Sequence, residues 1–252
     1  MDNTQSALVE IAEIPFEVRC RFTGNLKFFR EYMTDKEPLF TIEPTEKDLR
    51  ISQACYDYLA EQEGSPKVQY DDCFLENDAI HSAFSMKIVE YRTLLIHGSA
   101  LCMDGEAYIF VADSGTGKST HSKLWREAFG DRVWMINDDK PVLKITDNGV
   151  TAYGTPWNGK HRLGRNASAP VKAIVSLNRG AENRIEPMSK TDAFRLLLKH
   201  AHTSRKVEWM NTILSMDKQL VDNVAWYRLF CNMEPEAAII AWKGMNKGIP
   251  CV

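Results

Sequence analysis

Apolar positions along residues 1–75 recur at the short spacing of β-strands. Residues 16–22 alternate apolar and charged side chains, which is typical of a half-buried strand. Residues 39–42 form a second candidate strand, and the Gln-Glu-Gly-Ser-Pro run at 62–66 indicates a turn or linker. With one helix, this pattern predicts a small α+β segment over residues 1–75, and nothing in it resembles a catalytic site.

From residue 76 onward the spacing of the apolar residues changes. A helix that ends near residue 92 is predicted by apolar side chains at helical spacing: Ile80, Phe84, Ile88 and Tyr91. Asp-Gly at 104–105 and Asn-Gly at 148–149 suit hairpin turns. The remaining pattern predicts strands at 93–97, 98–102, 106–111, 133–137 and 171–177, and helices at 119–129 and 190–199. The last fifty residues show no pattern that assigns an element.

This order of elements predicts an α/β fold for residues 76–252, with a mixed, strongly twisted sheet around a P-loop. Hydrophobic residues make up 44% of the chain and charged residues 26%, which is ordinary for a globular protein. The formal net charge of −3 provides no global field that would attract nucleic acid or an anionic membrane. The amino terminus has no secretory pattern, and the cysteines are scattered. We therefore expect a cytoplasmic protein that binds neither nucleic acid nor membrane.

A glycine-rich segment carries the strongest chemical signal. It follows a predicted strand and opens a predicted helix, which is the context of a Walker A loop, although alanine stands at the first position of the motif. Glycines allow successive N–H groups to point at phosphate oxygens, and the helix amino terminus adds positive potential there. The segment predicts a nucleotide-binding loop made of Asp113, Ser114, Gly115, Thr116, Gly117, Lys118, Ser119 and Thr120.

Two carboxylates end the apolar strand that follows this loop. Asp138 and Asp139 come about twenty residues after the loop, at the position of a Walker B carboxylate. One carboxylate can hold a metal ion, and the other can accept a proton from a hydroxyl group. Aspartate pairs are also common at strand ends as turn residues, so the pair gains its meaning from the nearby loop.

Two further segments are candidates for the same site. His97 ends a strand one hairpin before the glycine-rich loop, which returns it toward the phosphates, although a lone histidine is more often structural. A turn-rich segment at 154–165 carries Lys160, Arg162 and Arg165. These cations either contact a transferring phosphoryl group or an acidic acceptor, or they form a solvated basic loop. The sequence leaves both interpretations open.

Together these motifs resemble the HPr kinase/phosphorylase family, whose P-loop lies in a fold akin to phosphoenolpyruvate carboxykinase. That family has a His-Gly strand, a hairpin, a Ser-Gly-x-Gly-Lys-Ser loop and a strand ending in Asp-Asp. The same elements stand here at 97–98, 114–119 and 138–139, within residues 93–178. Residues 117–126 are similar to a bacterial subgroup of stand-alone homologues, some of which act on free serine or on modified peptides.

The resemblance implies ATP and Mg²⁺ as cofactors. By this resemblance Lys118 contacts the β-phosphate, Ser119 binds Mg²⁺ and His97 lines the phosphate site. Asp138 is the implied general base, and both Asp138 and Asp139 are implied metal ligands. Residues 154–160 replace the family's acidic, glycine-rich segment, and the amino-terminal segment is shorter than the family's regulatory domain. These departures argue against HPr itself as the acceptor.

We therefore expect a kinase that uses ATP and Mg²⁺ to phosphorylate a hydroxyl group, that of a serine in a small molecule, peptide or protein. Two alternatives stay open. One is a non-catalytic nucleotide-binding sensor or scaffold in a peptide-maturation system, and the other is a generic P-loop ATPase. Retention of both Asp138 and Asp139 favours the kinase, because a sensor needs only one metal ligand. Homo-oligomer formation is left open by the sequence.

Overall fold

The computed structural model describes residues 4–113, 115–202 and 207–247. The chain divides into two compact units, Met1–Ile88 and Val89–Val252. The first unit contains β1 (Gln5–Ile11), β2 (Ile14–Cys20), α1 (Thr23–Leu26), η1 (Lys27–Tyr32), β3 (Thr41–Ile42), α2 (Glu46–Glu63) and α3 (Asp72–Lys87). A 3-10 turn, η2 (Ile88–Tyr91), follows.

The second unit contains β4 (Thr93–Ile96), β5 (Ser99–Met103), β6 (Glu106–Val111), α4 (Lys118–Phe129), η3 (Gly130–Arg132), β7 (Val133–Asn137), β8 (Val142–Thr146), β9 (Gly149–Tyr153), β10 (Ser168–Arg179), β11 (Arg184–Pro187), α5 (Lys190–His200), β12 (Ala201–His202), α6 (Val207–Asn223), β13 (Ala225–Cys231) and α7 (Glu236–Met245).

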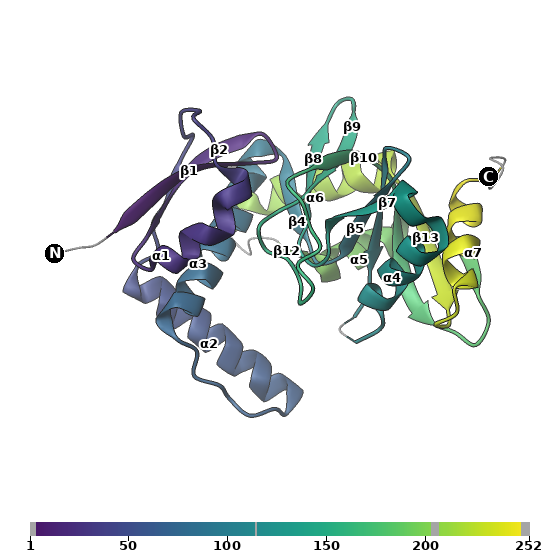
Figure 1. The fold of residues 1–252 in the computed structure, drawn as a ribbon, viewed down its shortest axis with the longest axis horizontal. Coiled ribbons are helices and arrows are strands. Elements are labelled where there is room, and N and C mark those ends of the chain that lie inside the picture. Colours follow the sequence, from purple (N-terminus) through teal and green to yellow (C-terminus); the bar gives the residue numbers. More distant parts are fainter. Residues whose placement is uncertain (1–3, 114, 203–206, 248–252) are drawn as a thin grey trace. The chain divides into compact units, whose positions relative to one another are not determined.

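The second unit is built on a curled, mixed sheet (Figure 1). Its strands lie in the order β12-β4-β8-β9-β10-β6-β5-β7, and β13 pairs with β10 and with β11. The long strand β10 pairs antiparallel with β9 at its start and parallel with β6 and β13 further along. Because β6, β10 and β13 are parallel, their carboxyl ends meet at one edge of the sheet.

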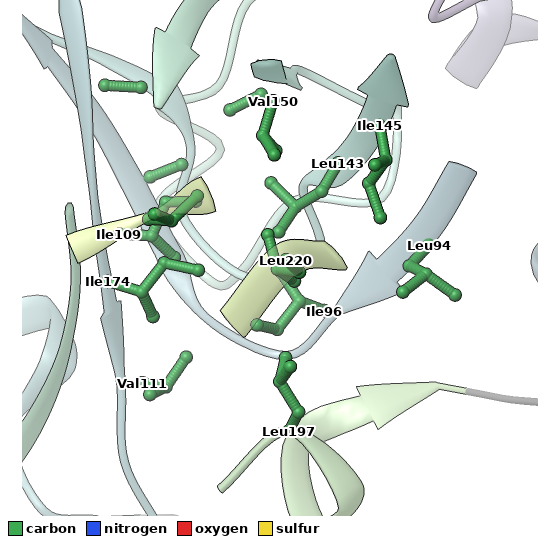
Figure 2. Close-up of a cluster of buried hydrophobic side chains, with 14 of the residues drawn as sticks. Leu94, Ile96, Ile109, Val111, Leu143, Ile145, Val150, Ile174, Leu197 and Leu220 are labelled. Atoms are coloured by element: carbon green, nitrogen blue, oxygen red, sulfur yellow. The ribbon is translucent and has the colours of Figure 1, made fainter. Parts of the chain in front are cut away.

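Helices cover both faces of this sheet. Along β6, Ile109 and Val111 belong to one buried cluster, whereas Tyr108 and Phe110 belong to the other. The first cluster includes side chains from α5 and α6, such as Leu197 and Leu220 (Figure 2). The second includes side chains of α4 and α7, such as Trp125 and Trp242. Burial on both faces explains why β6 reads as a continuous apolar run instead of an alternating one.

The elements predicted from the apolar pattern around the glycine-rich loop are confirmed. Strands β4 to β7, the hairpin from β8 to β9, strand β10 and helices α3, α4 and α5 all form at the predicted segments. Within the unassigned last fifty residues, the described part, 207–247, contains α6, β13 and α7. The fold is thus a mixed α/β fold with a mixed sheet. In the described part of the chain, no helix is both long and apolar enough to cross a membrane.

The first unit holds a small sheet and two longer helices. Strands β1 and β2 pair antiparallel, and β3 adds to β2 in parallel. Helix α2 begins with a capping box, in which Thr45 and Asp48 satisfy each other's backbone N–H groups. Helix α3 packs along α2 and therefore falls within this unit, whose boundary lies at Ile88. The sequence-based division after residue 75, by contrast, precedes most of α3.

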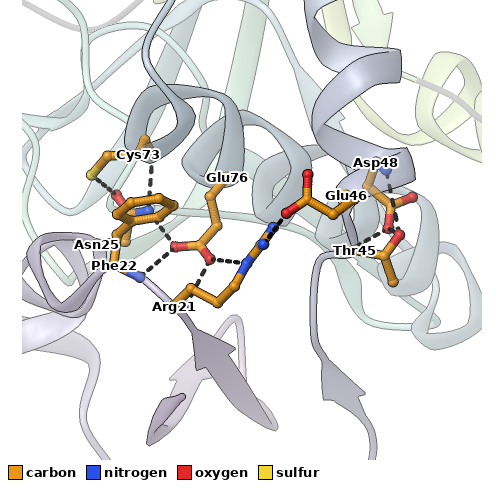
Figure 3. Close-up of polar contacts among 8 residues, drawn as sticks. All are labelled: Arg21, Phe22, Asn25, Thr45, Glu46, Asp48, Cys73 and Glu76. Atoms are coloured by element: carbon orange, nitrogen blue, oxygen red, sulfur yellow. Dashed lines mark hydrogen bonds and ion pairs between the residues drawn. The ribbon is translucent and has the colours of Figure 1, made fainter. Parts of the chain in front are cut away.

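A buried carboxylate organises the end of β2 (Figure 3). Glu76, on α3, is fully buried. Its Oε1 accepts from the backbone N–H of Arg21 at 2.8 Å, and its Oε2 accepts from the N–H of Phe22 at 3.2 Å and from Asn25 Nδ2 at 2.8 Å. Arg21 also pairs with Glu46 on α2. Since β2 ends at Cys20, these N–H groups need an acceptor outside the sheet, and Glu76 supplies it.

Replacing Glu76 by Gln tests this arrangement. The amide of glutamine has one acceptor oxygen and one NH₂ donor, so at least one buried N–H group loses its acceptor. We expect the free energy of unfolding of the first unit to fall by about 1–3 kcal/mol in urea titrations. The control is Glu37→Gln, at an exposed position of the same unit, with an expected change within about 0.5 kcal/mol. Equal stability of the two variants would contradict the role of Glu76.

Candidate functional site

Three segments that carry candidate site residues meet at one edge of the sheet in the second unit. Strand β5 lies between β6 and β7 and runs antiparallel to both, with Ser99 opposite Phe110 and Ala100 opposite Asn137. The start of β5 therefore lies beside the ends of β6 and β7. This register brings His97, the glycine-rich loop after Val111 and the Asp138–Asp139 pair to the same edge, as the sequence order predicts.

The glycine-rich loop turns sharply between β6 and α4. Gly115 and Gly117 have φ angles of 74° and 118°, which side chains with a Cβ atom rarely adopt. The N–H of Thr116 donates to the carbonyl of Asp113 at 3.2 Å, and α4 begins directly after Gly117. Arg179, at the end of β10, donates from Nη2 to the carbonyl of Gly115 at 2.7 Å. Ser114 lies outside the described residues.

Lys118, His97 and Asp139 form a series of polar contacts next to this loop. Lys118 Nζ donates to the carbonyl of Ala112 at 2.9 Å and lies 3.1 Å from His97 Nε2. His97 Nδ1 lies 3.3 Å from Asp139 Oδ1. Because an ammonium group only donates, Nε2 is the acceptor, and the proton of a neutral imidazole lies on Nδ1, facing Asp139.

Opposing effects act on the pKa values of Lys118 and Asp139. Burial lowers the pKa of Lys118, while the carboxylates of Asp139 and Asp113 act in the opposite direction. Burial alone would raise the pKa of Asp139. The hydrogen bond from His97, with smaller effects of Lys140 and Lys118, outweighs it, so that this pKa lies below its usual value. The carboxylate form of Asp139 is therefore favoured next to Lys118.

A second ion pair lies at the start of the loop. Asp113 Oδ1 lies 2.5 Å from Lys199 Nζ, at the end of α5, and 3.9 Å from His200 Nε2. The hydrogen bond from Lys199 lowers the pKa of Asp113. The carbonyl of His200 accepts from the N–H of His97 at 2.8 Å. The end of α5 thus contacts both the glycine-rich loop and the segment that carries His97.

Asp138 faces a different space from Asp139. Its Oδ1 accepts from the N–H of Gly159 at 2.8 Å, and its carbonyl accepts from Ser99 Oγ at 3.2 Å. Asp138 and Ser119 line one pocket of about 600 Å³, together with His161 and residues of α4. Hydroxyl and carboxylate oxygens are the donors that Mg²⁺ prefers, and Mg²⁺ beside phosphates needs only one or two carboxylates. Within the described residues, no group of three or more His, Cys, Asp or Glu side chains could hold a metal ion.

The turn-rich segment after β9 folds onto the end of β7. Strand β7 has a bulge here, since the register with β5 shifts between Ala100 and Leu101. The carbonyl of Ile136 accepts from the N–H of Arg165 at 3.0 Å. A Cβ atom on Gly154 would lie 1.8 Å from the carbonyl oxygen of Arg165, so only glycine fits there. The segment is therefore a closely packed loop at the site.

Asn137 connects this loop to the aspartate pair. Its side chain is fully buried. Nδ2 donates to the carbonyls of Thr155 at 3.1 Å and Trp157 at 3.3 Å, and Oδ1 accepts from the N–H groups of Asp139 at 2.8 Å and Lys140 at 2.6 Å. One amide thus holds the turn that carries the carboxylates and the loop that faces them.

Comparisons with known proteins add one distant likeness. No protein-family model matches the chain. No curated protein matches it either. Among solved structures it is similar to the HPr(Ser) kinase/phosphatase from Coxiella burnetii, with 11% sequence identity and a TM-score of 0.33. The match covers 60% of this chain and 95% of that chain. The likeness is distant and lies at the level of the fold.

The cations of the 154–165 segment lie apart from the pocket lining. Lys160 and Arg162 have exposed side chains. The guanidinium of Arg165 lies 5.5 Å from the ring centre of Trp134. In the loop itself, the pocket is lined by His161 and Leu163. Thr120 is exposed on the first turn of α4, next to Ser119.

Sequence reasoning did not assign Asn137 a role, nor did it assign one to His161 alone. The sequence signal at Asn137 is a polar residue at the end of an apolar strand, which does not by itself indicate that the amide holds a loop. The sequence signal at His161 is its place within the basic segment, where Lys160 and Arg162 are the stronger candidates because they carry a charge. Only the folded loop distinguishes the side chain that lines the pocket from those beside it.

The variant Asn137→Asp tests how the loop is held. A carboxylate keeps the acceptor for the N–H groups of Asp139 and Lys140, but it places a second oxygen against the carbonyls of Thr155 and Trp157. We expect the free energy of unfolding to fall by about 1–3 kcal/mol. The backbone amide of Gly159 should exchange hydrogen faster, as measured by mass spectrometry or NMR.

Asn148→Asp, at an exposed position of the β8–β9 turn, is the matched control and should leave both measurements nearly unchanged. Unchanged exchange in Asn137→Asp would show that the loop does not depend on this amide.

Proposed function

We propose that this chain is an ATP- and Mg²⁺-dependent phosphotransferase that acts on a hydroxyl acceptor. The observation that carries the proposal is the meeting of a glycine-rich loop, its lysine and two differently placed carboxylates at one sheet edge. Lys118 lies under the loop with His97 and Asp139, whereas Asp138 faces the pocket with Ser119. This division suits a reaction that needs both a phosphate-binding charge and a free proton acceptor.

Phosphate binding is supported by the loop and the start of α4. Positive φ angles at Gly115 and Gly117 suit a backbone whose N–H groups turn toward one anion. The first turn of α4 adds the positive end of the helix dipole. Lys118 contributes a full charge, and its contact with His97 keeps the ammonium near the loop. ATP is the proposed substrate at this position.

The oxygen donors at the site fit a magnesium ion. Ser119 would offer a hydroxyl group and Asp139 a carboxylate, while Asp138 stays available as the base. When bound, Mg²⁺ would neutralise negative charge on the β- and γ-phosphates. In the proposed arrangement the His97 contact orients Asp139, while Ser119 and Asp138 share the pocket.

In the proposed reaction Asp138 is the base. It accepts the proton of the acceptor hydroxyl while the acceptor oxygen forms a bond to the γ-phosphorus. The bond between that phosphorus and the oxygen that bridges to the β-phosphate breaks, and ADP leaves with this electron pair. The N–H of Gly159 donates to Asp138 Oδ1 and so orients the carboxylate. This contact leaves Oδ2 for the acceptor proton.

Two alternatives use the same loop. A generic ATPase would use water in place of the acceptor, and a sensor or scaffold in a peptide-maturation system would bind nucleotide without transfer. The pocket of about 600 Å³ beside Asp138 favours transfer, since this volume suits a small organic molecule and greatly exceeds the space one water needs.

Nucleotide binding is tested with Lys118→Ala. We expect wild-type protein to bind Mg²⁺·ATP and the variant to bind it at least about tenfold more weakly, because a charge-assisted contact to phosphate is lost. Isothermal titration calorimetry measures both affinities. Lys47→Ala, an exposed lysine of the first unit, is the matched control and should bind like the wild type. Equal affinities in all three proteins would remove Lys118 from the phosphate site.

Catalysis is tested with Asp138→Asn. Asparagine can keep the oxygen that accepts from Gly159 but cannot take up a proton. ATP affinity should change little, while transfer from labelled ATP should fall by roughly two to four orders of magnitude. The control, Asp131→Asn, changes an exposed aspartate and should retain full activity.

Suitable acceptors are free serine, HPr and serine-containing peptides. Unchanged transfer in Asp138→Asn would assign the base elsewhere. Tight ATP binding by the wild type without transfer to any acceptor would favour the sensor, and release of phosphate to water alone would favour the ATPase.

A further inference from the structure

The pocket beside Asp138 is lined by residues of α4 as well as by residues next to the glycine-rich loop. Asp138 and Ser119 lie next to the glycine-rich loop. The same pocket continues along α4 to Lys123, Arg126 and Glu127. Since Ser119 precedes Arg126 by seven residues on one helix, their Cα atoms lie roughly 10 Å apart along the helix axis. An occupant that reacts at Asp138 therefore also meets the charged groups of α4.

The part of α4 that lines the pocket carries two positive side chains and one negative side chain. Lys123 and Glu127 are one helical turn apart and form an ion pair at 3.4 Å, so their charges largely offset each other toward an occupant. Arg126 keeps its full charge. Its Nε donates to the carbonyl of Ser122 at 3.4 Å. Among the described residues, its two terminal nitrogens form no hydrogen bond or ion pair.

The contact with Ser122 directs Arg126 back along the helix. Side chains on a helix lean toward its amino terminus, and this hydrogen bond holds the guanidinium over the preceding turn. That turn is closer to Ser119 than the Cα atom of Arg126 is.

The loop at 154–165 contributes a second polar group to the pocket lining. His161 lies in the loop that the Gly159 contact with Asp138 and the Asn158 contact with Gly164 hold in place. An imidazole ring can donate to an oxygen of an anion. Arg126 and His161 thus offer donors from two different elements around the same space.

We propose that the acceptor is a small anionic hydroxyl compound, whose carboxylate or phosphate group binds Arg126 and His161 while its hydroxyl group faces Asp138. This inference rests on the proposed phosphotransfer function and names the acceptor class for that site. The fork of donors in a guanidinium matches the two oxygens of such an anion. A pocket of about 600 Å³ lies in the size range of small-molecule sites.

The test compares acceptors that differ only in their anionic group. Glycerol 3-phosphate is paired with glycerol, and serine with serinamide, each assayed for transfer from labelled ATP. In the wild type, the anionic member of at least one pair should have a kcat/KM at least about tenfold higher. In Arg126→Gln its KM should rise on the order of tenfold to a hundredfold with kcat nearly unchanged, as expected for a lost charged hydrogen bond.

Two variants serve as controls. Arg195→Gln removes an exposed arginine from α5 and should behave like the wild type. Arg126→Lys keeps the charge without the fork and should fall between the wild type and Arg126→Gln. Equal use of neutral and anionic acceptors, transfer only to serine-containing peptides, or an Arg126→Gln variant that matches Arg195→Gln would overturn the proposal.

A binding measurement separates this inference from the proposed function. The same anionic compounds are titrated by calorimetry into protein that holds Mg²⁺ and a non-hydrolysable ATP analogue. Binding that the wild type shows and Arg126→Gln loses supports the anion site, even if no transfer occurs and the proposed catalysis fails. Absence of binding to the wild type, with the ATP analogue bound, would overturn the anion site and leave nucleotide binding intact.

Discussion

The candidate site depends above all on the pairing of β5 with β6 on one side and β7 on the other. This register places the start of one strand beside the ends of the other two, so that His97, Lys118 and the two aspartates share one edge. A shift of β5 by one residue would turn its alternate side chains to the opposite face. Buried clusters on both faces oppose such a shift, because each contains side chains from β5, β6 and several helices.

Neighbouring charges have different surroundings at this edge. Asp139 contacts His97, which also contacts Lys118. Because these side chains are partly buried, the electrostatic interactions between them are stronger than they would be in water. Asp138 is oriented by a backbone N–H and lines a pocket. Adjacent carboxylates in one turn thus have separate environments, which allows one to maintain a charge network while the other meets an occupant.

The loop at 154–165 owes its position to β7 more than to its own charges. The bulge in β7 leaves the carbonyl of Ile136 for the N–H of Arg165, and Asn137 binds the beginning of the loop. These backbone contacts hold the loop in which His161 lines the same pocket as Arg126 of α4. The proposed recognition and the proposed reaction at this pocket would therefore depend on the same strand end.

The sequence by itself determined the elements around the glycine-rich loop, because strands buried on both faces and a glycine-initiated helix have distinct local patterns. It also indicated that His97 lies near the glycine-rich loop, since a hairpin joins their strands, and the motif spacing predicted the aspartate pair there. The pairing of β5 with β7, which brings Asp138 and Asp139 to this edge, is a property of the tertiary structure. Only the tertiary structure decided which aspartate faces Lys118 and which faces the pocket. The same holds for Asn137, whose amide joins segments that are distant in sequence, and for His161 and Arg126, which line one pocket from different elements. The apolar periodicity of the sequence does not predict such contacts. The Asn137 amide, for example, binds backbone carbonyl groups, and every residue has one.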